Sequence, residues 1–184
     1  MRIGGVVAVM LIGSALLAGA AEKPLQVVEA LDVERYMGKW YAIASIPTSF
    51  ERQCVQGTTA EYTLLENGQV EVVNTCYDAD GKVDVARGRA WIPDPKEPTK
   101  LKVSFVNILW FWLFAAPYWV IDLAPDYSYA VVGHPSRQYG WILSRTPTLP
   151  DDVFSGIVTR LEEQGCRFED FRIIDQSIHA GASD

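Results

Sequence analysis

The chain has 184 residues, of which 49% are hydrophobic and 21% charged, and its formal net charge is −7. This length and apolar content support one domain with a hydrophobic core. The acidic balance, and the absence of any Lys/Arg run longer than two, argue against nucleic acid as a partner.

Residues 1–20 have the pattern of a cleaved secretory signal peptide. Arg2 supplies the positive start, residues 6–17 form an apolar run, and Ala18-Gly19-Ala20 offers small residues at the cleavage site. The run is shorter than the roughly 20 residues that a membrane-spanning helix needs. We therefore expect export: to the periplasm, with the outer membrane as an option, if the source is bacterial, and otherwise secretion.

An extended arm follows, then a short helical turn capped by Asp32. Eight segments next show the alternation and turn spacing of a β-meander, and Glu66-Asn67-Gly68 is a strong hairpin turn. The predicted strands are residues 40–46, 59–65, 69–76, 83–92, 101–106, 118–123, 128–133 and 139–145.

One helix is expected after these strands. Thr148 is its predicted cap, Pro150 lies in its first turn and Gly165 ends it. Its apolar stripe should pack on the outside of a barrel. A short ninth strand is expected at residues 172–175. The sequence thus predicts a barrel domain over residues 21–176 and a loose tail over residues 177–184.

The chain has three cysteines, so at most two of them pair within it. Export permits disulfides. Cys54 and Cys76 flank one predicted hairpin, which favours that pair, and a Cys54–Cys166 bridge is the alternative. Cys166 itself has the surroundings of a small buried hydrophobic residue.

Two distant residues predict how the barrel is closed. Gly38-Lys39-Trp40-Tyr41 opens the first strand, and Arg145 ends the eighth. We expect Trp40 to plug one end, with the Arg145 guanidinium stacked on its indole ring and Gly38 beside them. A barrel of roughly eight strands closed at one end can hold one small ligand.

Strand alternation predicts which side chains face the interior. The expected inner face is aromatic and aliphatic with a single amide, which suits a long apolar ligand with one polar contact. A fully packed core is the alternative. The inward set includes Ala42, Ala44, Tyr62, Asn74, Gly88, Ala90, Leu101, Val103, Phe105, Trp141 and Leu143.

The most apolar stretch after the signal segment connects the fifth and sixth strands, at the expected open mouth. It is too short to cross a bilayer, and its exposure would be an aggregation liability. Three interpretations stay open: a lid over the mouth, a contact with a membrane or a second protomer, and a packed hairpin. Its large residues are Leu109, Trp110, Phe111, Trp112, Leu113 and Phe114.

Gly38-x-Trp40-Tyr41, Asp126-Tyr127 and Arg145, in this order, resemble the three signature regions of the lipocalins. The surrounding segments resemble the bacterial lipocalin and apolipoprotein D branch of that family. The resemblance implies an all-β fold, an eight-stranded antiparallel up-and-down barrel with one helix packed outside. It also implies binding of a fatty acid, a lysophospholipid or a similar lipid. The matching ligand-binding positions are Tyr36, Tyr62, Asn74, Phe105, Tyr118 and Trp141.

Two departures from the family pattern stand out. Pro125 precedes Asp126 where the second signature usually has Thr, so one hydrogen bond at the closed end is missing. No cysteine lies near residue 20, whereas bacterial members often carry a lipid-modified one, so a lipid anchor is not expected.

Other function classes remain as alternatives. A lipocalin-fold enzyme acting on an enclosed lipid could use Cys54 as a nucleophile if that thiol is unpaired. An interaction protein could form a homodimer through the apolar mouth loop. No cofactor is expected, and no metal site, because the sequence has no Cys/His cluster.

Overall fold

The structure, a computed structural model, describes residues 23–109 and 111–180. Three predicted features lie partly or wholly outside the described part: the signal peptide at residues 1–20, the mouth-loop residue Trp110, and the last four residues of the tail. In the described part, the helices fall short of the length and hydropathy that crossing a bilayer by a helix requires.

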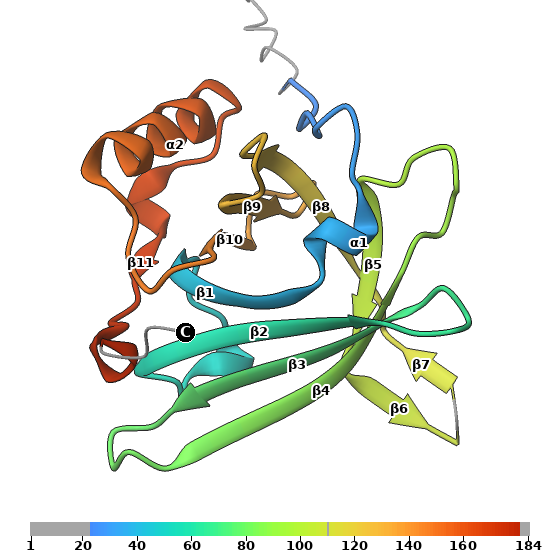
Figure 1. Ribbon diagram of the computed structural model, residues 1–184, viewed down its shortest axis with the longest axis horizontal. Coiled ribbons are helices and arrows are strands. Elements are labelled where there is room, and N and C mark those ends of the chain that lie inside the picture. Colours follow the sequence, from blue (N-terminus) through green and yellow to red (C-terminus); the bar gives the residue numbers. More distant parts are fainter. Residues whose placement is uncertain (1–22, 110, 181–184) are drawn as a thin grey trace, which may run out of the picture.

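Eight antiparallel strands form a closed barrel, because β10 pairs with β9 on one side and with β1 on the other (Figure 1). A short extra strand, β11, pairs with β1 outside this ring. The barrel strands are β1 (Gly38–Ser45), β2 (Gln56–Leu64), β3 (Val70–Tyr77), β4 (Val83–Trp91), β5 (Lys100–Ser104), β8 (Ala116–Leu123), β9 (Tyr129–Gly133) and β10 (Gly140–Ser144). The remaining elements are α1 (Val33–Tyr36), η1 (Ser49–Glu51), β6 (Val106–Ile108), β7 (Phe111–Leu113), α2 (Asp151–Glu163), η2 (Phe168–Asp170), β11 (Arg172–Ile173) and η3 (Ser177–His179).

The predicted all-β barrel and its eight strands are therefore confirmed, with strand ends that differ by three residues or fewer. The turn before β3 has its glycine in the left-handed region, with φ of +77° at Gly68. Asp32 caps α1 as expected, since its carboxylate accepts a hydrogen bond from the backbone N–H of Arg35 at 3.1 Å.

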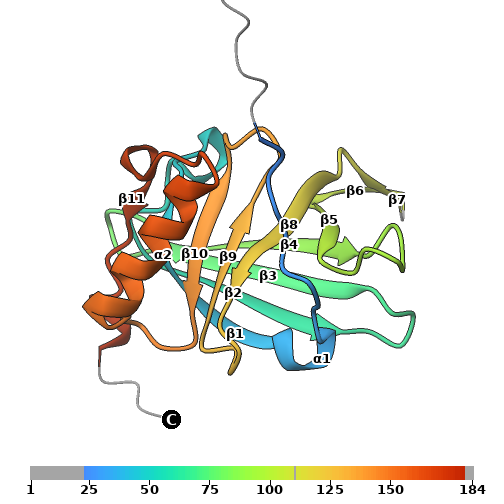
Figure 2. The same ribbon diagram turned by 90° about the horizontal axis from the view of Figure 1, so that it is seen from above.

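Helix α2 packs on the outside of the barrel, as the sequence predicts (Figure 2). Ile157 and Leu161 are its buried residues and share an apolar cluster with Ile142 of β10. Gly165, with φ of +75°, ends the helix. The predicted cap was wrong: Pro150 occupies that position, because the helix starts at Asp151, two residues later than Thr148 would require.

One residue expected on the inner face lies outside. The pairing of β1 with β10 shifts between Ala42 and Ala44, which is a β-bulge. A bulge inserts an extra residue and reverses the alternation beyond it. Ala42 therefore belongs to the interior cluster, whereas Ala44 packs in the cluster beneath α2.

The last residue of the predicted domain, Gln176, and the start of the predicted loose tail, up to His179, are both packed against the barrel. Gln176 is buried, and its side-chain N–H groups donate to the carbonyl oxygens of Ala42 at 2.7 Å and Thr58 at 2.9 Å. The ring of His179 lies 5.2 Å from that of Tyr41. The expectation of looseness missed these contacts because they join residues more than 100 positions apart in the sequence.

The barrel wall is incomplete beside β4. Strand β5 pairs only with Arg89–Trp91 of β4, because it ends at Ser104, opposite Arg89. Among the described residues, the first half of β4 pairs with β3 alone, and its residues 83–87 are exposed. The chain then leaves the wall as the β6–β7 hairpin, which lies on the side of the barrel opposite α2 in both views (Figures 1 and 2).

Candidate functional site

The closed end of the barrel is built around one indole ring. Trp40 is fully buried, and the guanidinium carbon of Arg145 lies 3.7 Å from the centre of its ring. The predicted stacking is thus confirmed. Arg145 also donates to the carbonyl oxygens of Lys39 at 3.0 Å and Arg35 at 2.7 Å, while the Trp40 indole N–H donates to the Tyr36 carbonyl at 2.9 Å. The floor therefore ties α1, β1 and the end of β10 together.

Gly38 supplies the backbone conformation with which β1 begins at this floor. Its φ of +88° lies in the region that glycine enters without steric cost, and a β-carbon placed there would lie 3.5 Å from Arg145 Nη1. The turn with Pro125 in place of threonine is still joined to the floor. The Tyr127 carbonyl accepts from Arg145 Nε at 3.4 Å, and the Tyr127 hydroxyl accepts from the Asp32 backbone N–H at 2.8 Å.

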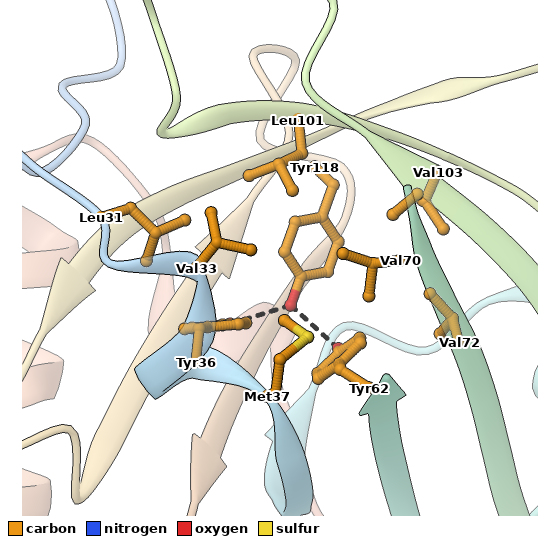
Figure 3. Close-up of a pocket in the computed structure, with 11 residues that line it drawn as sticks. Leu31, Val33, Tyr36, Met37, Tyr62, Val70, Val72, Leu101, Val103 and Tyr118 are labelled. Atoms are coloured by element: carbon orange, nitrogen blue, oxygen red, sulfur yellow. Dashed lines mark hydrogen bonds between the residues drawn. The ribbon is translucent and has the colours of Figure 1, made fainter. Parts of the chain in front are cut away.

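An apolar cavity of about 20 Å³ lies in the barrel interior close to this floor. Eleven residues line it, and none of them carries a charged side chain (Figure 3). They come from the arm and turn before β1 and from five barrel strands. The lining residues are Leu31, Val33, Tyr36, Met37, Tyr62, Val70, Val72, Ala90, Leu101, Val103 and Tyr118.

Three tyrosine hydroxyls meet in this cavity. The Tyr118 hydroxyl lies 2.9 Å from that of Tyr36 and 2.9 Å from that of Tyr62, and it hydrogen-bonds both (Figure 3). Burial raises the pKa of Tyr62 to about 12 and holds the pKa values of Tyr36 and Tyr118 well above the usual tyrosine range. All three phenols therefore remain neutral at physiological pH, as polar groups in an apolar cavity.

The other three predicted binding residues lie outside the cavity lining. Asn74 is half-buried, and its side-chain oxygen is enclosed with no hydrogen-bond partner among the described residues. Phe105 is 40% exposed, and its ring covers Gly88, where an added β-carbon would lie only 2.7 Å away. Trp141 is half-buried on β10. The structure therefore brings together Tyr36, Tyr62 and Tyr118 but places Asn74, Phe105 and Trp141 elsewhere.

Trp141 has a neighbour that the sequence did not single out. Burial raises the pKa of the Glu51 carboxyl, and hydrogen bonds from Thr48 and Trp141, with the charge of Arg172, act in the opposite direction. Glu51 comes from the connection between β1 and β2. A carboxyl group therefore stands beside the indole that the resemblance assigns to ligand binding.

Sequence reasoning also missed the contribution of the chain before β1. Leu31, Val33 and Met37 line the cavity although they precede the first strand. Their apolar character around a capped turn was a usable signal, because a short amphipathic turn must cover something apolar. Strand alternation could not place them, since it applies only within strands.

The predicted apolar mouth loop is the β6–β7 hairpin. Ser104 is buried at its base, and its hydroxyl contacts the carbonyl oxygens of Val106 and Leu113. The guanidinium carbon of Arg89 lies 5.5 Å from the centre of the Trp112 ring. Because Arg89 alternates with the interior residue Ala90, this contact is on the outer face of the wall rather than across the mouth.

The opposite face of the hairpin is apolar and exposed. Phe114 is 85% exposed, Leu109 80% and Phe111 71%. Val106 pairs with Leu113 and Ile108 with Phe111, so these four side chains share one face. Leu109 and Phe114 also have positive φ values, +49° and +55°, which residues other than glycine rarely adopt. The hairpin thus presents large apolar side chains to solvent in an unfavourable backbone conformation.

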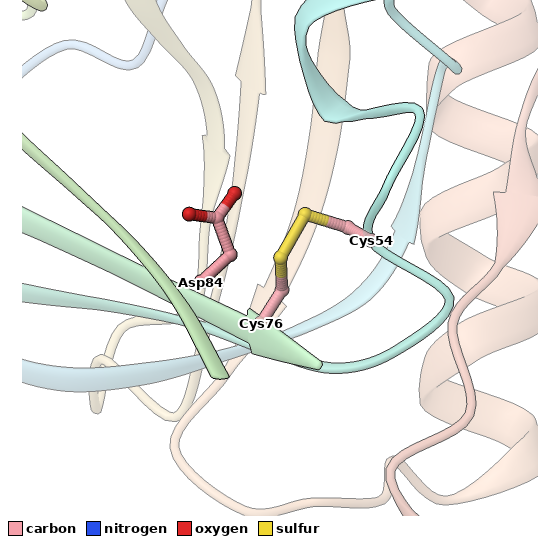
Figure 4. A group of neighbouring side chains, drawn as sticks. All are labelled: Cys54, Cys76 and Asp84. Atoms are coloured by element: carbon pink, nitrogen blue, oxygen red, sulfur yellow. A yellow bond between two sulfur atoms is a disulfide. The ribbon is translucent and has the colours of Figure 1, made fainter. Parts of the chain in front are cut away.

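Cys54 and Cys76 form a disulfide, as predicted (Figure 4), while Cys166 is buried in the cluster beneath α2. The carboxylate of Asp84 lies beside the bridge and accepts a hydrogen bond from the Gln53 amide at 2.6 Å. Metal binding and nucleophilic attack by cysteine both need the thiolate. The oxidised pair therefore supplies neither chemistry at this place.

Comparisons with known proteins cover most of the chain. A family model described as a lipocalin-like domain matches residues 31–176. Temperature-induced lipocalin-1 of Arabidopsis thaliana is 40% identical over 147 residues, which cover 78% of this chain and 78% of that protein. Apolipoprotein D of Bos taurus is 40% identical over 174 residues, covering 89% and 86%. Outer membrane lipoprotein Blc of Escherichia coli K12 is 36% identical over 151 residues, covering 82% of each.

Solved structures share the architecture. Insecticyanin from the tobacco hornworm Manduca sexta superimposes with a TM-score of 0.63 at 22% identity, covering 82% of this chain and 84% of that one. Apocrustacyanin C2 superimposes with a TM-score of 0.62 at 21% identity, covering 79% of each chain. At this level of identity, the similarity concerns the fold alone.

Proposed function

The chain belongs to the lipocalin family, and from this we propose that it binds and carries a small lipophilic ligand, such as a fatty acid or a lysophospholipid, in its barrel. The observation that supports this most is the cavity near the Trp40–Arg145 floor, whose lining carries no charge. Ligand sites of this kind are mostly apolar with a few placed polar groups. Tyr36, Tyr62 and Tyr118 are the polar groups here.

Binding requires the cavity to widen. Its volume of about 20 Å³ accommodates about one water molecule, whereas pockets for small ligands measure roughly 300–1,000 Å³. Met37 and Phe105 are suited to move, because a methionine side chain adapts readily and the Phe105 ring is exposed on one side. Each methylene that leaves water gains about 0.8 kcal/mol, so a long chain can offset the displacement of these side chains.

Blocking the cavity tests this proposal. We expect Ala90→Phe to weaken binding of a neutral, environment-sensitive fluorophore at least about tenfold, since a new ring would fill the space that the ligand needs. Val85→Phe, on the exposed first half of β4, is the matched control and should leave binding unchanged. Both variants are checked by urea unfolding, because overpacking costs about 1–3 kcal/mol. Native mass spectrometry of the purified protein then identifies any co-purified lipid. Failure of the unmodified protein to bind the fluorophore, with no co-purified lipid, would contradict the proposal.

We also propose that the exposed face of the β6–β7 hairpin docks on a membrane. It is formed by Val106, Ile108, Phe111 and Leu113, with Leu109 and Phe114 beside it. Each large apolar side chain withdrawn from water contributes about 1.5–3 kcal/mol. The net charge of −7 opposes anionic lipid. A zwitterionic surface is therefore the better target, and docking there would let a lipid enter the barrel from the bilayer.

Serine substitution of the exposed face tests the docking. We expect the combined change of Ile108, Leu109, Phe111 and Phe114 to serine to abolish flotation with phosphatidylcholine liposomes, because the four side chains supply most of the exposed apolar area. Trp112 stays unchanged, so its contact with Arg89 is kept. Val83→Ser with Val85→Ser, which removes exposed apolar groups elsewhere, is the control. Equal flotation of all three proteins would rule the docking out.

The same face could instead join two copies of the chain. Sedimentation with and without detergent separates the two cases, because a homodimer persists without lipid. We propose a carrier rather than an enzyme, since Cys54, the thiol considered as a nucleophile, is held in a disulfide.

We further propose that the protein is exported. The disulfide fits an oxidising compartment, and residues 1–20 have the composition of a removable signal peptide. The site of action would be the periplasm, including the outer membrane surface, if the source is bacterial, and the extracellular space otherwise.

A further inference from the structure

The three tyrosines of the cavity hold one more proton than they can share. Each phenol has one O–H donor and accepts through its oxygen. Two hydrogen bonds join the three groups, both through Tyr118, and each uses one proton. Among the described residues, the third proton has no acceptor. It is therefore a buried donor among apolar side chains, where an unmet hydrogen bond is costly.

A second polar group on the same inner face lacks its partner too. The Asn74 side-chain oxygen is enclosed without a hydrogen bond. Asn74 pairs with Ala60, and Tyr62 pairs with Val72, so Asn74 and Tyr62 are diagonal neighbours on adjacent strands. Diagonal neighbours lie about 7–8 Å apart, within reach of long side chains. The unused acceptor therefore belongs to a residue on the strand next to that of Tyr62, just beyond the lining of the cavity.

The charge of this region favours an uncharged group. None of the eleven lining residues is charged, and burial keeps the three phenols neutral. The charge of Arg145 lowers the pKa values of Tyr36 and Tyr62, but burial raises them by more. Its guanidinium already stacks on Trp40 and donates to backbone carbonyls of Arg35 and Lys39. A carboxylate beside the tyrosines would lose its water and gain only this weaker attraction, which is unfavourable.

We propose that the cavity selects a neutral lipophile with a hydroxyl group, such as a long-chain alcohol or a monoacylglycerol, and binds it with the hydroxyl between the tyrosines and Asn74. The hydroxyl oxygen accepts the spare phenol proton, and the hydroxyl proton is donated to the Asn74 oxygen. The apolar chain lies against the valine and leucine side chains and extends past Phe105 towards solvent. This inference rests on the proposed function and specifies the class of its ligand.

A series of twelve-carbon compounds tests the selection by displacement of a neutral fluorophore. The compounds are dodecanol, dodecane, dodecanoic acid and methyl dodecanoate. We expect dodecanol to bind about tenfold more tightly than dodecane, as two otherwise unmet hydrogen bonds would give. Methyl dodecanoate accepts a hydrogen bond but donates none, so its affinity should lie between those of dodecanol and dodecane. The affinity for dodecanoic acid should fall as the pH rises from about 5 to about 8, because its ionised form is disfavoured. The affinity for dodecanol should stay constant over the same range.

Replacing Tyr36, Tyr62 and Tyr118 together with phenylalanine removes every phenol donor of the cavity and keeps the rings. We expect it to abolish the preference for dodecanol while leaving the affinity for dodecane unchanged, and Asn74→Leu to reduce the preference in part. Tyr139→Phe, on a partly exposed tyrosine outside the cavity lining, is the matched control. Urea unfolding of each variant separates a lost contact from a lost fold.

Three results would overturn the inference and leave the proposed function intact. The first is equal affinity of the unmodified protein for dodecanol and dodecane. The second is tighter binding of ionised dodecanoate than of dodecanol. The third is an equal loss of affinity for both ligands in the triple tyrosine variant, because the hydroxyls would then act through the shape of the cavity. If no compound displaces the fluorophore and the fluorophore itself does not bind, the proposed function fails instead.

Discussion

Replacing Trp40 with alanine is expected to lower the free energy of unfolding by about 3–5 kcal/mol, the usual result of truncating a fully buried Trp. The change removes the indole that packs beneath the interior cluster. It also removes the N–H donor to the Tyr36 carbonyl and the ring on which Arg145 stacks. Because this one side chain joins α1, β1 and the end of β10, the cavity next to it should lose its shape as well.

Urea unfolding followed by circular dichroism measures this effect. Trp112→Ala, a substitution of the same residue type on the β6–β7 hairpin, is the control and should cost about 1 kcal/mol or less, as changes outside the core do. Arg145→Lys keeps the charge but loses the planar guanidinium that donates to two carbonyls. Its loss of unfolding free energy should therefore lie between those of Trp40→Ala and Trp112→Ala. Equal losses for Trp40→Ala and Trp112→Ala would show that the floor does not stabilise the barrel.

Removing the disulfide by the double change Cys54→Ala and Cys76→Ala should lower the free energy of unfolding by about 3 kcal/mol. The two cysteines are 22 residues apart, and a loop of this size loses about that much chain entropy in the unfolded state when it is closed. The bridge also joins the connection before β2 to the end of β3. Without it, this end of the β2–β3 hairpin keeps its backbone pairing and hydrogen bonds such as Gln53–Asp84 and Arg172 to the Cys54 carbonyl, but no covalent link.

The contribution of the disulfide to the free energy of unfolding can also be measured without mutation. Treating the unmodified protein with a reductant should shift its urea midpoint to that of the double variant, and the double variant should not respond to the reductant. A midpoint that reduction leaves unchanged would show that the bridge adds no stability.

The barrel could be predicted because its strands are short, alternating and separated by strong turns. The segment 69–76 illustrates this, since Gly68 ends the turn before it and Val70 and Val72 alternate towards the interior. The bulge between Ala42 and Ala44 could not be predicted, because it depends on the register with β10 rather than on the residues of β1. The direction of the β6–β7 hairpin was equally hidden, since it depends on side-chain contacts, of Ser104 with the Leu113 carbonyl and of Trp112 with Arg89, that no strand pattern encodes.

The candidate site was predictable in part. Alternation placed Tyr62 on the inner face, and the family resemblance added Tyr36 and Tyr118; all three line the cavity. That their hydroxyls meet follows from the way α1, β2 and β8 come together in the barrel, which no local pattern encodes. The roles of Asn74, Phe105 and Trp141 in ligand binding stay predictions, because the described cavity does not reach them.

The short length of β5 has a consequence for association between molecules. The first half of β4 carries backbone N–H and C=O groups on its free side that another extended chain could pair with, and such edges promote fibrous aggregation. Charged side chains within an edge are a common protection against this, and Asp84 and Arg87 stand in this one. Without these two charges, residues 83–87 would present only valine, alanine and neutral side chains to solvent. The charges of Asp84 and Arg87 therefore oppose association along this free edge of β4.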